Sequence, residues 1–374
     1  MRVGILGGGQ LARMLAQAGR PLGLEFTFLC PEPQACAAPF GEHLCARFDD
    51  QRAQHRLAGW ADVVTYEFEN VPLKQVESLA QRVNLLPPSV ALAVARDRLY
   101  EKNHFETLGI PTAAFAPVDS LDDLINGVAE VGLPAILKTR TQGYDGKGQA
   151  VLRQSSDLSV AWEKIAKVPC IVESMVKFER ELSIIAARNH SGEIVYYPLS
   201  ENHHREGILR LSISRENEPL QEAAEQNISR IMEDLNYIGV LALELFQVGG
   251  KLLANEMAPR VHNSGHWTIE GSHTSQFENH LRAICGWRLG ETSLTHSAAM
   301  INLIGQLPRE GDLRSVPGAT PHFYGKAERP GRKVGHVTLI CDDSNPGQFN
   351  QHLSYLLRLA GESELLDQLF PDKE

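Results

Sequence analysis

Short apolar runs alternate with an amphipathic stretch in the first part of the chain. Arg2–Leu6, Glu25–Cys30 and Asp62–Tyr66 have the length and composition of buried strands, and Gln10–Ala18 has helical spacing. Strand and helix patterns that alternate in this way are typical of β-α-β units with a parallel sheet. Pro87-Pro88 interrupts the pattern. We therefore expect a Rossmann-like α/β domain over residues 1–90.

The pattern changes after residue 90. A helical stretch over Ala91–Leu108 comes first and is closed by Gly109 and Pro111. Many of the apolar runs beyond it follow one another without a long helix between them, which favours an antiparallel sheet. The strands that we expect are Ala135–Thr139, Gln149–Arg153, Cys170–Glu173, Glu181–Ala187, Ile194–Pro198, Gly239–Phe246 and Lys251–Asn255. We expect a middle domain over residues 91–290 and a small, β-rich C-terminal domain over residues 291–374.

Composition and charge exclude several classes of protein. Hydrophobic residues make up 43% and charged residues 22% of the chain, so neither disorder nor a fibrous repeat is expected. The formal net charge of −10 argues against a general nucleic-acid-binding protein. No run approaches the roughly twenty apolar residues that span a bilayer, and Met1–Gly7 reaches glycine too early for a secretory signal. We expect no nucleic-acid partner and no membrane partner.

The cysteines give no sign of a metal or redox motif. They are scattered and include no C-x-x-C pair, at positions Cys30, Cys36, Cys45, Cys170, Cys285 and Cys341. Reduced thiols in the cytoplasm are the simplest interpretation.

The first glycine turn indicates an anion site. Gly7-Gly8-Gly9-Gln10-Leu11-Ala12 fits the G-x-G-x-x-A pattern, in which glycines let a phosphate approach and a helix N-terminus directs N–H groups at it. A dinucleotide site also needs an acidic residue at the end of the second strand. This chain has Leu29-Cys30-Pro31-Glu32 there, a poor match. We favour a phosphate-bearing substrate at Gly9, Gln10 and Leu11; the alternative is a turn needed only for packing.

A second glycine-rich segment follows the strand expected at 135–139. Lys138 lies near the end of that strand, where an ammonium group is well placed against a phosphate. Glycines at positions 143, 146 and 148 let a hairpin loop fold over phosphates and offer N–H donors. The segment lacks the G-K-[ST] ending of a Walker loop. It predicts a nucleotide-phosphate loop, with an ordinary exposed hairpin as the alternative.

Two apolar strands that each carry a glutamate flank the turn at Gly249-Gly250. A charge in such a strand is costly unless a partner such as a divalent cation compensates it. A three-residue loop, 249–251, would place Glu244 opposite Glu256, whereas a two-residue loop would put the carboxylates on opposite faces of the sheet. Our hypothesis is that Glu244 and Glu256 hold magnesium that bridges ATP phosphates. The alternative is two strand glutamates that reach solvent at a sheet edge.

Hydrogen-bonding groups are concentrated directly after this hairpin, over residues 258–267. Arg260 can hold an oxyanion with two parallel hydrogen bonds, and His262 can donate a proton or stabilise developing charge. A second cationic group lies further on, and its alternative interpretation is a solvated surface. It comprises Lys326, Arg329, Arg332 and Lys333.

Taken in order, these motifs resemble the ATP-grasp superfamily and, within it, the 5-(carboxyamino)imidazole ribonucleotide synthase family. The resemblance runs from Gly7 to about His336. It rests on Gly-Gly-Gly-Gln-Leu at 7–11, Thr-Tyr-Glu-Phe-Glu-Asn at 65–70, Gly-Tyr-Asp-Gly-Lys-Gly-Gln at 143–149, Asn-Glu-Met-Ala-Pro-Arg-Val-His-Asn-Ser-Gly-His-Trp-Thr at 255–268 and Arg-Pro-Gly-Arg-Lys-Val-Gly-His at 329–336. It implies an ATP-grasp fold for the middle domain, with a mobile lid at about 112–175.

The resemblance also implies a reaction. ATP phosphorylates bicarbonate to carboxyphosphate, the amine of 5-aminoimidazole ribonucleotide is carboxylated, and ADP and phosphate leave. It implies a cytoplasmic homodimer of the de novo purine pathway that uses ATP and magnesium. Another ATP-grasp ligase such as a formate-using transformylase, a dinucleotide-dependent oxidoreductase and a non-catalytic nucleotide sensor are the alternatives.

The site residues that the resemblance implies fall into four groups. The ATP site would comprise Arg98, Lys138, Gly143, Tyr144, Asp145, Gly146, Lys147, Gly148, Gln149, Glu173, Ser174, Met175, Val176, Glu181, His204, Asn255 and Glu256. The substrate site would comprise Gly9, Gln10, Leu11, Glu67, Glu69, Tyr144, Arg260, His262, Asn263, Ser264, Lys326, Arg332 and Lys333. The catalytic residues would be Arg260, His262, Lys326 and Asp145, and the magnesium ligands Glu244 and Glu256.

Two positions depart from the family pattern. Gln142 stands where the loop often carries another glycine, which we expect to stiffen or slow loop closure. Ala12 replaces a common glycine inside the first helix, where no positive φ is needed, so we expect no effect.

Overall fold

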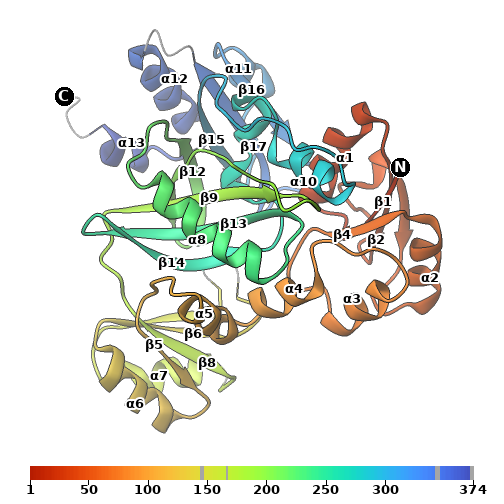
Figure 1. Ribbon diagram of the computed structural model, residues 1–374. Helices are drawn as coiled ribbons and strands as arrows, with labels where there is room; N and C mark the ends of the chain where they lie inside the picture. The colour runs from red at the N-terminus through yellow and green to blue at the C-terminus, as the bar shows by residue number, and fades with distance from the viewer. Residues whose placement is uncertain (144–146, 166, 342–345, 371–374) are drawn as a thin grey trace.

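The fold is taken from a computed structural model, which describes residues 1–143, 147–165, 167–341 and 346–370. Its strands form three sheets, one in the N-terminal part, one in a projecting lobe and one through the centre (Figure 1). This is the mixed α/β ATP-grasp architecture that the sequence predicts.

The N-terminal part is a parallel four-stranded sheet with the order β3-β2-β1-β4. The β-α-β pattern expected from the sequence is confirmed, and β3 is a strand that the pattern did not reveal. The elements are β1 (Arg2–Leu6), α1 (Gln10–Gly19), η1 (Arg20–Leu22), β2 (Glu25–Cys30), η2 (Ala38–Phe40), β3 (Glu42–Cys45), α2 (Gln51–Trp60), β4 (Val63–Tyr66) and α3 (Leu73–Ala80).

The helical stretch expected as one piece over 91–108 is two helices, α4 (Ser89–Ala95) and α5 (Arg98–Thr107). The prediction of a single helix was wrong because Asp97 interrupts it. Asp97 has an extended backbone, and its carboxylate accepts the N–H groups of Leu99 and Tyr100, so it caps α5. The cap fixes the start of the helix at Arg98.

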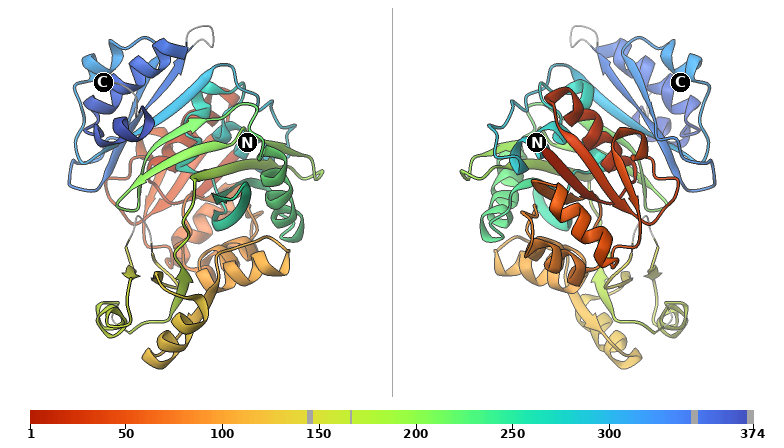
Figure 2. Two further views of the ribbon diagram at one scale, coloured as in Figure 1. Left: turned by 90° about the vertical axis from the view of Figure 1, so that its left-hand side faces the viewer. Right: turned by 90° about the vertical axis from the view of Figure 1, so that its right-hand side faces the viewer.

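The projecting lobe is an antiparallel sheet with the order β5-β8-β6-β7 and two covering helices (Figures 1 and 2). Its separate core includes Val118, Leu124, Leu137, Leu152 and Trp162. The elements are β5 (Phe115–Val118), α6 (Leu121–Val131), β6 (Ala135–Thr139), β7 (Gln149–Leu152), α7 (Asp157–Lys164) and β8 (Cys170–Ser174).

A nine-stranded antiparallel sheet runs through the centre in the order β14-β13-β9-β11-β12-β15-β17-β16, with β10 paired to β9. Strands of the C-terminal part therefore extend the middle sheet through the β12–β15 pair. Its strands are β9 (Arg180–Arg188), β10 (Ile194–Tyr196), β11 (Ser200–Arg205), β12 (Ile208–Ser214), β13 (Gly239–Val248), β14 (Lys251–Ala258), β15 (Ser297–Ile304), β16 (Ala319–Phe323) and β17 (Lys333–Cys341). The associated helices are α8 (Gln221–Asp234), η3 (Asn263–Gly265), α9 (Thr268–Gly271), α10 (Gln276–Ile284), α11 (Glu310–Arg314), α12 (Pro346–Leu359) and α13 (Glu364–Leu369).

The N-terminal sheet and the central sheet share one apolar core. Leu15 of α1 and Phe28 of β2 belong to the same buried cluster as Val240 of β13 and Phe277 and Leu281 of α10. Each such side chain contributes roughly 1.5–3 kcal/mol when it is fully buried. Because α1 packs on α10, the first glycine turn is held at a fixed place beside the central sheet. Among the described residues, no helix is both long and apolar enough to cross a bilayer.

Candidate active site

A cavity of about 710 Å³ lies where the N-terminal part, the projecting lobe and the central sheet meet. Residues from all three parts line it, so segments far apart in the sequence meet there. Those singled out from the sequence that line it are Gly9, Gln10, Leu11, Glu67, Glu69, Arg98, Lys138, Gln142, Gly143, Lys147, Gln149, Glu181, His204, Glu244, Asn255, Glu256, Arg260, His262, Asn263 and Lys333.

The β13–β14 hairpin brings Glu244 and Glu256 into this cavity, but its loop length and strand register differ from those that we expected. The loop is the two-residue Gly249–Gly250 turn, because Val248 pairs with Lys251. Leu243 pairs with Met257 and Leu245 with Ala254, so one residue of β13, Glu244, faces two residues of β14. This β-bulge restores the register that a two-residue loop would have lost. The expectation that a two-residue loop would separate the two carboxylates was wrong, because both glutamates line the same cavity.

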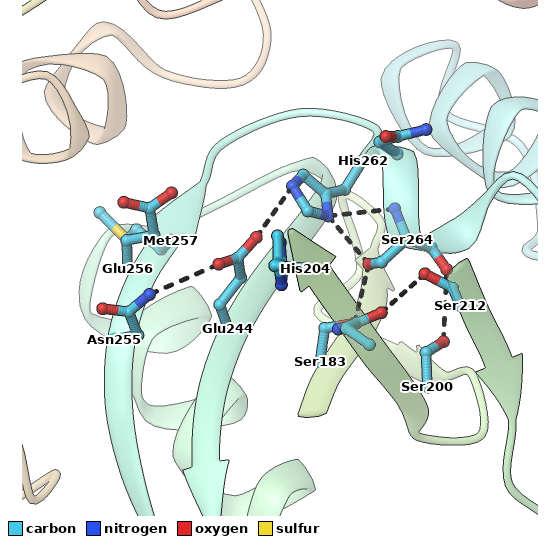
Figure 3. Close-up of polar contacts among 12 residues, drawn as sticks. Ser183, Ser200, His204, Ser212, Glu244, Asn255, Glu256, Met257, His262 and Ser264 are labelled. Carbon is cyan, nitrogen blue, oxygen red and sulfur yellow. Dashed lines mark hydrogen bonds and ion pairs between the residues drawn. The ribbon is translucent and has the colours of Figure 1, made fainter. Parts of the chain in front are cut away.

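The bulge also places Asn255 beside Glu256 on the cavity wall, whereas Ala254 belongs to the core beneath the hairpin. Figure 3 shows the Glu244 carboxylate between Asn255 and His262. The Asn255 amide donates to Glu244 Oε2 over 3.5 Å, and His262 Nε2 lies 3.3 Å from Glu244 Oε1. Glu244 is therefore oriented from both sides.

The two carboxylates differ in pKa because their surroundings differ. Burial and then the neighbouring charge of Glu256 raise the pKa of Glu244 to about 7. Burial also opposes ionisation of Glu256, but the Arg98 guanidinium, which donates to Glu256 Oε2 at 2.7 Å, outweighs burial and lowers the pKa of Glu256 to about 2. A cation placed between the carboxylates would favour the ionised form of Glu244.

The donor set is suited to magnesium. Mg²⁺ prefers oxygen ligands and commonly binds one or two carboxylates together with substrate phosphates. Glu244 and Glu256 supply carboxylate oxygens on one wall of the cavity, and Asn255 lies beside them. No group of three or more His, Cys, Asp or Glu side chains within the described ranges has the arrangement of a metal site. A magnesium ion at this wall therefore needs oxygens from a ligand such as a nucleotide phosphate.

Three ions from α5, β6 and β8 meet behind the cavity wall, and two of them, Lys102 and Glu173, are buried. Lys138 donates to Glu173 Oε2 at 3.1 Å, and Lys102 Nζ lies 3.5 Å from the same oxygen. Burial opposes ionisation of Glu173, but the two lysines outweigh burial and lower the pKa of Glu173. Lys138 lines the cavity, whereas Lys102 lies behind it. Lys138 is therefore the ammonium group that an anionic ligand would meet.

Aromatic and aliphatic side chains form an apolar part of the cavity wall. The rings of Phe178 and Phe246 stack with centroids 4.9 Å apart at 9°, and both line the cavity with Ile136. On β9 and β11, Glu181 Oε2 lies 2.5 Å from His204 Nδ1. Burial disfavours the charged form of His204, but the Glu181 carboxylate outweighs this and raises the pKa of His204. A flat, weakly polar ligand group fits against this wall.

Arg260 and His262 project from the segment between β14 and η3. Arg260 forms an ion pair with Glu69 at 2.7 Å, and its Nε is buried without a hydrogen-bond partner among the described residues. The His262 ring contacts Glu244 through Nε2 and Ser264 Oγ through Nδ1 at 2.9 Å. Burial, followed by the positive charge of Arg260, lowers the pKa of His262 to about 3. His262 is therefore a neutral imidazole at physiological pH in this structure.

The first turn of α1 is occupied by a carboxylate of the chain itself. Glu67 accepts the N–H groups of Gly9 and, at 2.9 Å, of Ala12. A Cβ on Gly7 would come within 2.4 Å of Glu67 Cγ, and Gly7 has a φ of 123°. These glycines therefore allow Glu67 to approach the backbone. The neighbouring Gln10 accepts a hydrogen bond from Lys326 through Oε1.

Several expected site residues do not line the cavity. Ser264 is fully buried beneath His262, and Arg332 donates to the Ala327 carbonyl of its own loop. The expected residues that are absent from the lining are Gly148, Glu173, Ser174, Met175, Val176, Ser264, Lys326 and Arg332. Tyr144, Asp145 and Gly146 lie outside the described residues. Gln142 has a φ of 63°, so it adopts the left-handed conformation that glycine adopts more readily.

Two buried ions at the site were missed from the sequence. Lys102 and Glu101 are 1% and 2% exposed, and Glu101 accepts the Met257 N–H at 2.7 Å. The signal was the spacing Arg98-x-x-Glu101-Lys102, because residues three and four apart lie on one face of a helix. Charges on the apolar side of a helix indicate a buried ion network.

Comparisons with known proteins cover nearly the whole chain. Residues 1–96 match the ribonucleotide synthetase preATP-grasp domain, 103–277 the ATP-grasp domain and 298–347 the phosphoribosylaminoimidazole carboxylase C-terminal domain. The chain is 52% identical to the N5-carboxyaminoimidazole ribonucleotide synthase of Pseudomonas aeruginosa over 343 residues, which cover 92% of this chain and 95% of that relative.

Solved structures give the same result. The N5-carboxyaminoimidazole ribonucleotide synthetase of Thermus thermophilus matches with a TM-score of 0.91 and 52% identity, over 96% of this chain and 98% of that one. The N5-carboxyaminoimidazole synthase of Aspergillus clavatus, solved with ADP and 5-aminoimidazole ribonucleotide, matches with a TM-score of 0.89 and 28% identity, over 96% of this chain and 98% of that one.

Proposed function

Because the chain belongs to the N5-carboxyaminoimidazole ribonucleotide synthase family of ATP-grasp ligases, we propose that it carboxylates 5-aminoimidazole ribonucleotide with bicarbonate and ATP. Bicarbonate oxygen attacks the γ-phosphorus of ATP, giving carboxyphosphate and ADP. The exocyclic amine then attacks the carbonyl carbon of carboxyphosphate. A C–N bond forms, inorganic phosphate leaves, and the amine loses a proton.

One observation carries this proposal: a single cavity is lined by the first turn of α1, by Lys138 of the projecting lobe and by the paired glutamates of the hairpin. A reaction between a nucleotide triphosphate and a second phosphate-bearing substrate needs both in one enclosed space. The 710 Å³ cavity falls within the 300–1,000 Å³ typical of ligand pockets.

The ATP end of the cavity has cations and an apolar wall. Lys138 and Arg98, which line the cavity, would contact phosphate oxygens, and the stacked rings of Phe178 and Phe246 would offer a face for the adenine ring. Glu244 and Glu256 would hold magnesium. When bound, magnesium supplies the positive charge that stabilises the phosphates during transfer. Glu181 with His204, the backbone of 173–176 and the 143–149 loop complete the ATP site in this proposal.

Arg260 and His262 would contact bicarbonate and the carboxylate that forms from it. The buried Arg260 Nε lacks a partner among the described residues, which supports an anion there. His262 directs its Nε2 at Glu244 beside the magnesium position, so an N–H donor lies next to the place where negative charge develops. Asn263 lines the same part of the cavity.

The ribonucleotide would bind at the N-terminal end. Gln10 and Leu11 begin α1, where the helix dipole favours a phosphate, and Lys326 and Lys333 provide positive charge nearby. Glu67 is engaged with the backbone of α1, so Glu69 is the carboxylate that we place against the ribose or the amine. Tyr144 and Asp145, which lie outside the described residues, and Arg332, which donates to the Ala327 carbonyl, also belong to this proposal.

Two wider features belong to the same proposal. The six cysteines are free thiols, which supports a reducing compartment and therefore the cytoplasm. We also propose a homodimer, which sedimentation of the purified protein would test. Sedimentation at a single-chain mass of 41.3 kDa would contradict it.

An ADP-release assay tests the reaction. The expected result is ADP and phosphate release that requires 5-aminoimidazole ribonucleotide and bicarbonate together, with ¹³C from labelled bicarbonate in the product. Formate in place of bicarbonate should give no ADP. ADP release with formate alone would assign the chain to a transformylase, and ATP binding without turnover would assign it to a nucleotide sensor.

A further inference from the structure

Four small polar side chains lie buried in a row beneath His262. Ser183, Ser212 and Ser264 are fully buried, and Asn202 is 5% exposed. They come from β9, β12, η3 and β11. Burial of polar groups is costly unless they are hydrogen-bonded, and an apolar core would be cheaper at these positions. Such a row therefore needs an explanation beyond packing.

The row is a continuous chain of hydrogen bonds that runs in one direction. Ser212 Oγ donates to Asn202 Oδ1 at 2.7 Å, because that oxygen only accepts. Asn202 Nδ2 donates to Ser183 Oγ at 3.0 Å, and Ser183 Oγ donates to Ser264 Oγ at 2.7 Å. Ser264 Oγ has its own hydrogen left for His262 Nδ1, 2.9 Å away. Figure 3 shows Ser264 between Ser183 and the His262 ring.

Both ends of the His262 ring require the same tautomer. The Ser264 N–H also points at Nδ1, at 3.4 Å, so Nδ1 is an acceptor. On the other side Glu244 Oε1 lies 3.3 Å from Nε2, and Glu244 in its ionised form only accepts. A neutral imidazole carries one hydrogen, and both neighbours place it on Nε2. The hydrogen-bond donors at Nδ1 and the carboxylate at Nε2 therefore both require the tautomer with its hydrogen on Nε2.

We propose that Ser264, supported by Ser183, Asn202 and Ser212, is a positioning residue that holds His262 as its Nε2–H tautomer, so that an N–H donor faces Glu244 and the cavity. The opposite tautomer would direct a lone pair at the Glu244 carboxylate and leave an oxyanion without a donor. The kinetic consequence rests on the proposed function, whereas the tautomer does not.

Ser264→Ala removes the hydroxyl donor and leaves only the longer backbone N–H contact. Ser183→Ala leaves the Ser264 hydroxyl in place but removes the donor that orients it. The matched control is Ser214→Ala. Ser214 is a buried serine of β12 whose hydroxyl bonds to the backbone of Ala298 and not to this row.

The first readout is the ¹⁵N spectrum of histidine-labelled protein without ligands at pH 8, where a histidine of ordinary pKa is neutral. The chain has 14 histidines, and His262→Gln identifies the signal of interest. We expect the Nε2–H signature in the wild type and in Ser214→Ala, and a mixture of tautomers in Ser264→Ala. A protonated Nδ1 in the wild type, or an unchanged tautomer in Ser264→Ala, overturns the proposal.

The second readout is steady-state turnover. A lost hydrogen bond to a neutral group corresponds to about a fivefold to tenfold fall in kcat for Ser264→Ala. Ser183→Ala should lower kcat by about twofold, and the KM for ATP should stay within twofold in both variants. If Ser264→Ala does not fold, Ser183→Ala carries the test. If the wild type releases no ADP with both substrates present, the proposed function fails, and the tautomer measurement still decides the role of Ser264.

Discussion

Lys102 Nζ lies 3.5 Å from Glu173 Oε2, deep behind the cavity that Lys138 lines. The same carboxylate oxygen accepts a hydrogen bond from Lys138 at 3.1 Å. Two lysines therefore share one carboxylate, although only one of them faces the position proposed for ATP. Burial disfavours the charged form of Lys102 and lowers its pKa, so its ammonium depends on Glu173.

The two lysines should respond differently to substitution. Lys138→Ala should raise the KM for ATP or lower kcat by at least about tenfold, because a phosphate would lose its cation. It should also lower stability, because the buried Glu173 loses a hydrogen-bond donor. Lys102→Met should lower the unfolding free energy by about 3 kcal/mol, because the Glu173 carboxylate would stay buried with only one of its two lysine partners. ADP release and urea unfolding measure the two effects, with the exposed Lys164→Ala as control. An equal rise of the KM for ATP in both variants would contradict this division.

Glu67 and Glu69 provide a second contrast. Glu67→Gln should destabilise the chain by about 1–3 kcal/mol, because the new amide can accept from only one of the Gly9 and Ala12 N–H groups. Glu69→Gln should leave stability nearly unchanged but raise the KM for the ribonucleotide, since Glu69 lines the cavity beside Arg260. Thermal unfolding and substrate titration separate them. A Glu67→Gln variant of normal stability with a raised KM would assign Glu67 to the substrate.

The hairpin shows where sequence reasoning reaches its limit. Two apolar runs and the Gly249-Gly250 turn correctly indicated two paired strands with a glutamate on each. The same reasoning required a three-residue loop for the glutamates to share a face. A bulge at Asn255 and Glu256 achieves this with a two-residue loop. A bulge depends on the neighbouring strand and on the cavity, and the local pattern carries no sign of either.

The rest of the site shows the same division. Most of the residues that line the cavity were identified from the glycine turns, from Lys138 at the end of a strand and from the family resemblance. These features can be recognised because each is a local sequence pattern. The partners of Glu67 and Lys102 lie 55 and 71 positions away in the sequence at Ala12 and Glu173. Such pairings follow from how the sheets pack, and the local sequence around the glycine turn gives no sign that Glu67 accepts the Gly9 and Ala12 N–H groups.

Removal of one proposed magnesium ligand should abolish most activity. Glu256→Gln keeps the shape and an acceptor for Arg98 but loses the charge, so we expect kcat to fall by roughly a hundredfold or more with the fold intact. ADP release across a range of magnesium concentrations, with thermal unfolding as the check on folding, measures this. Glu222→Gln, on an exposed position of α8, is the matched control. Near-normal turnover in Glu256→Gln at low magnesium would rule out the assignment.

His280 should make the folded chain sensitive to acid. The ring is 1% exposed; Nδ1 accepts the Val240 N–H at 3.1 Å and Nε2 bonds to Thr65 Oγ1 at 2.9 Å. Burial lowers the pKa of His280 to about 3, whereas the unfolded chain takes up this proton near pH 6.5. Its contribution to stability is therefore present above pH 6.5 and is lost as the pH falls, by about 2 kcal/mol at pH 5. Urea unfolding of the wild type and of His280→Gln at pH 7.5 and pH 5 tests this. His280→Gln should be less stable than the wild type at pH 7.5. Between pH 7.5 and pH 5 it should lose about 2 kcal/mol less unfolding free energy than the wild type. Parallel losses in the two proteins would show that His280 does not carry this pH dependence.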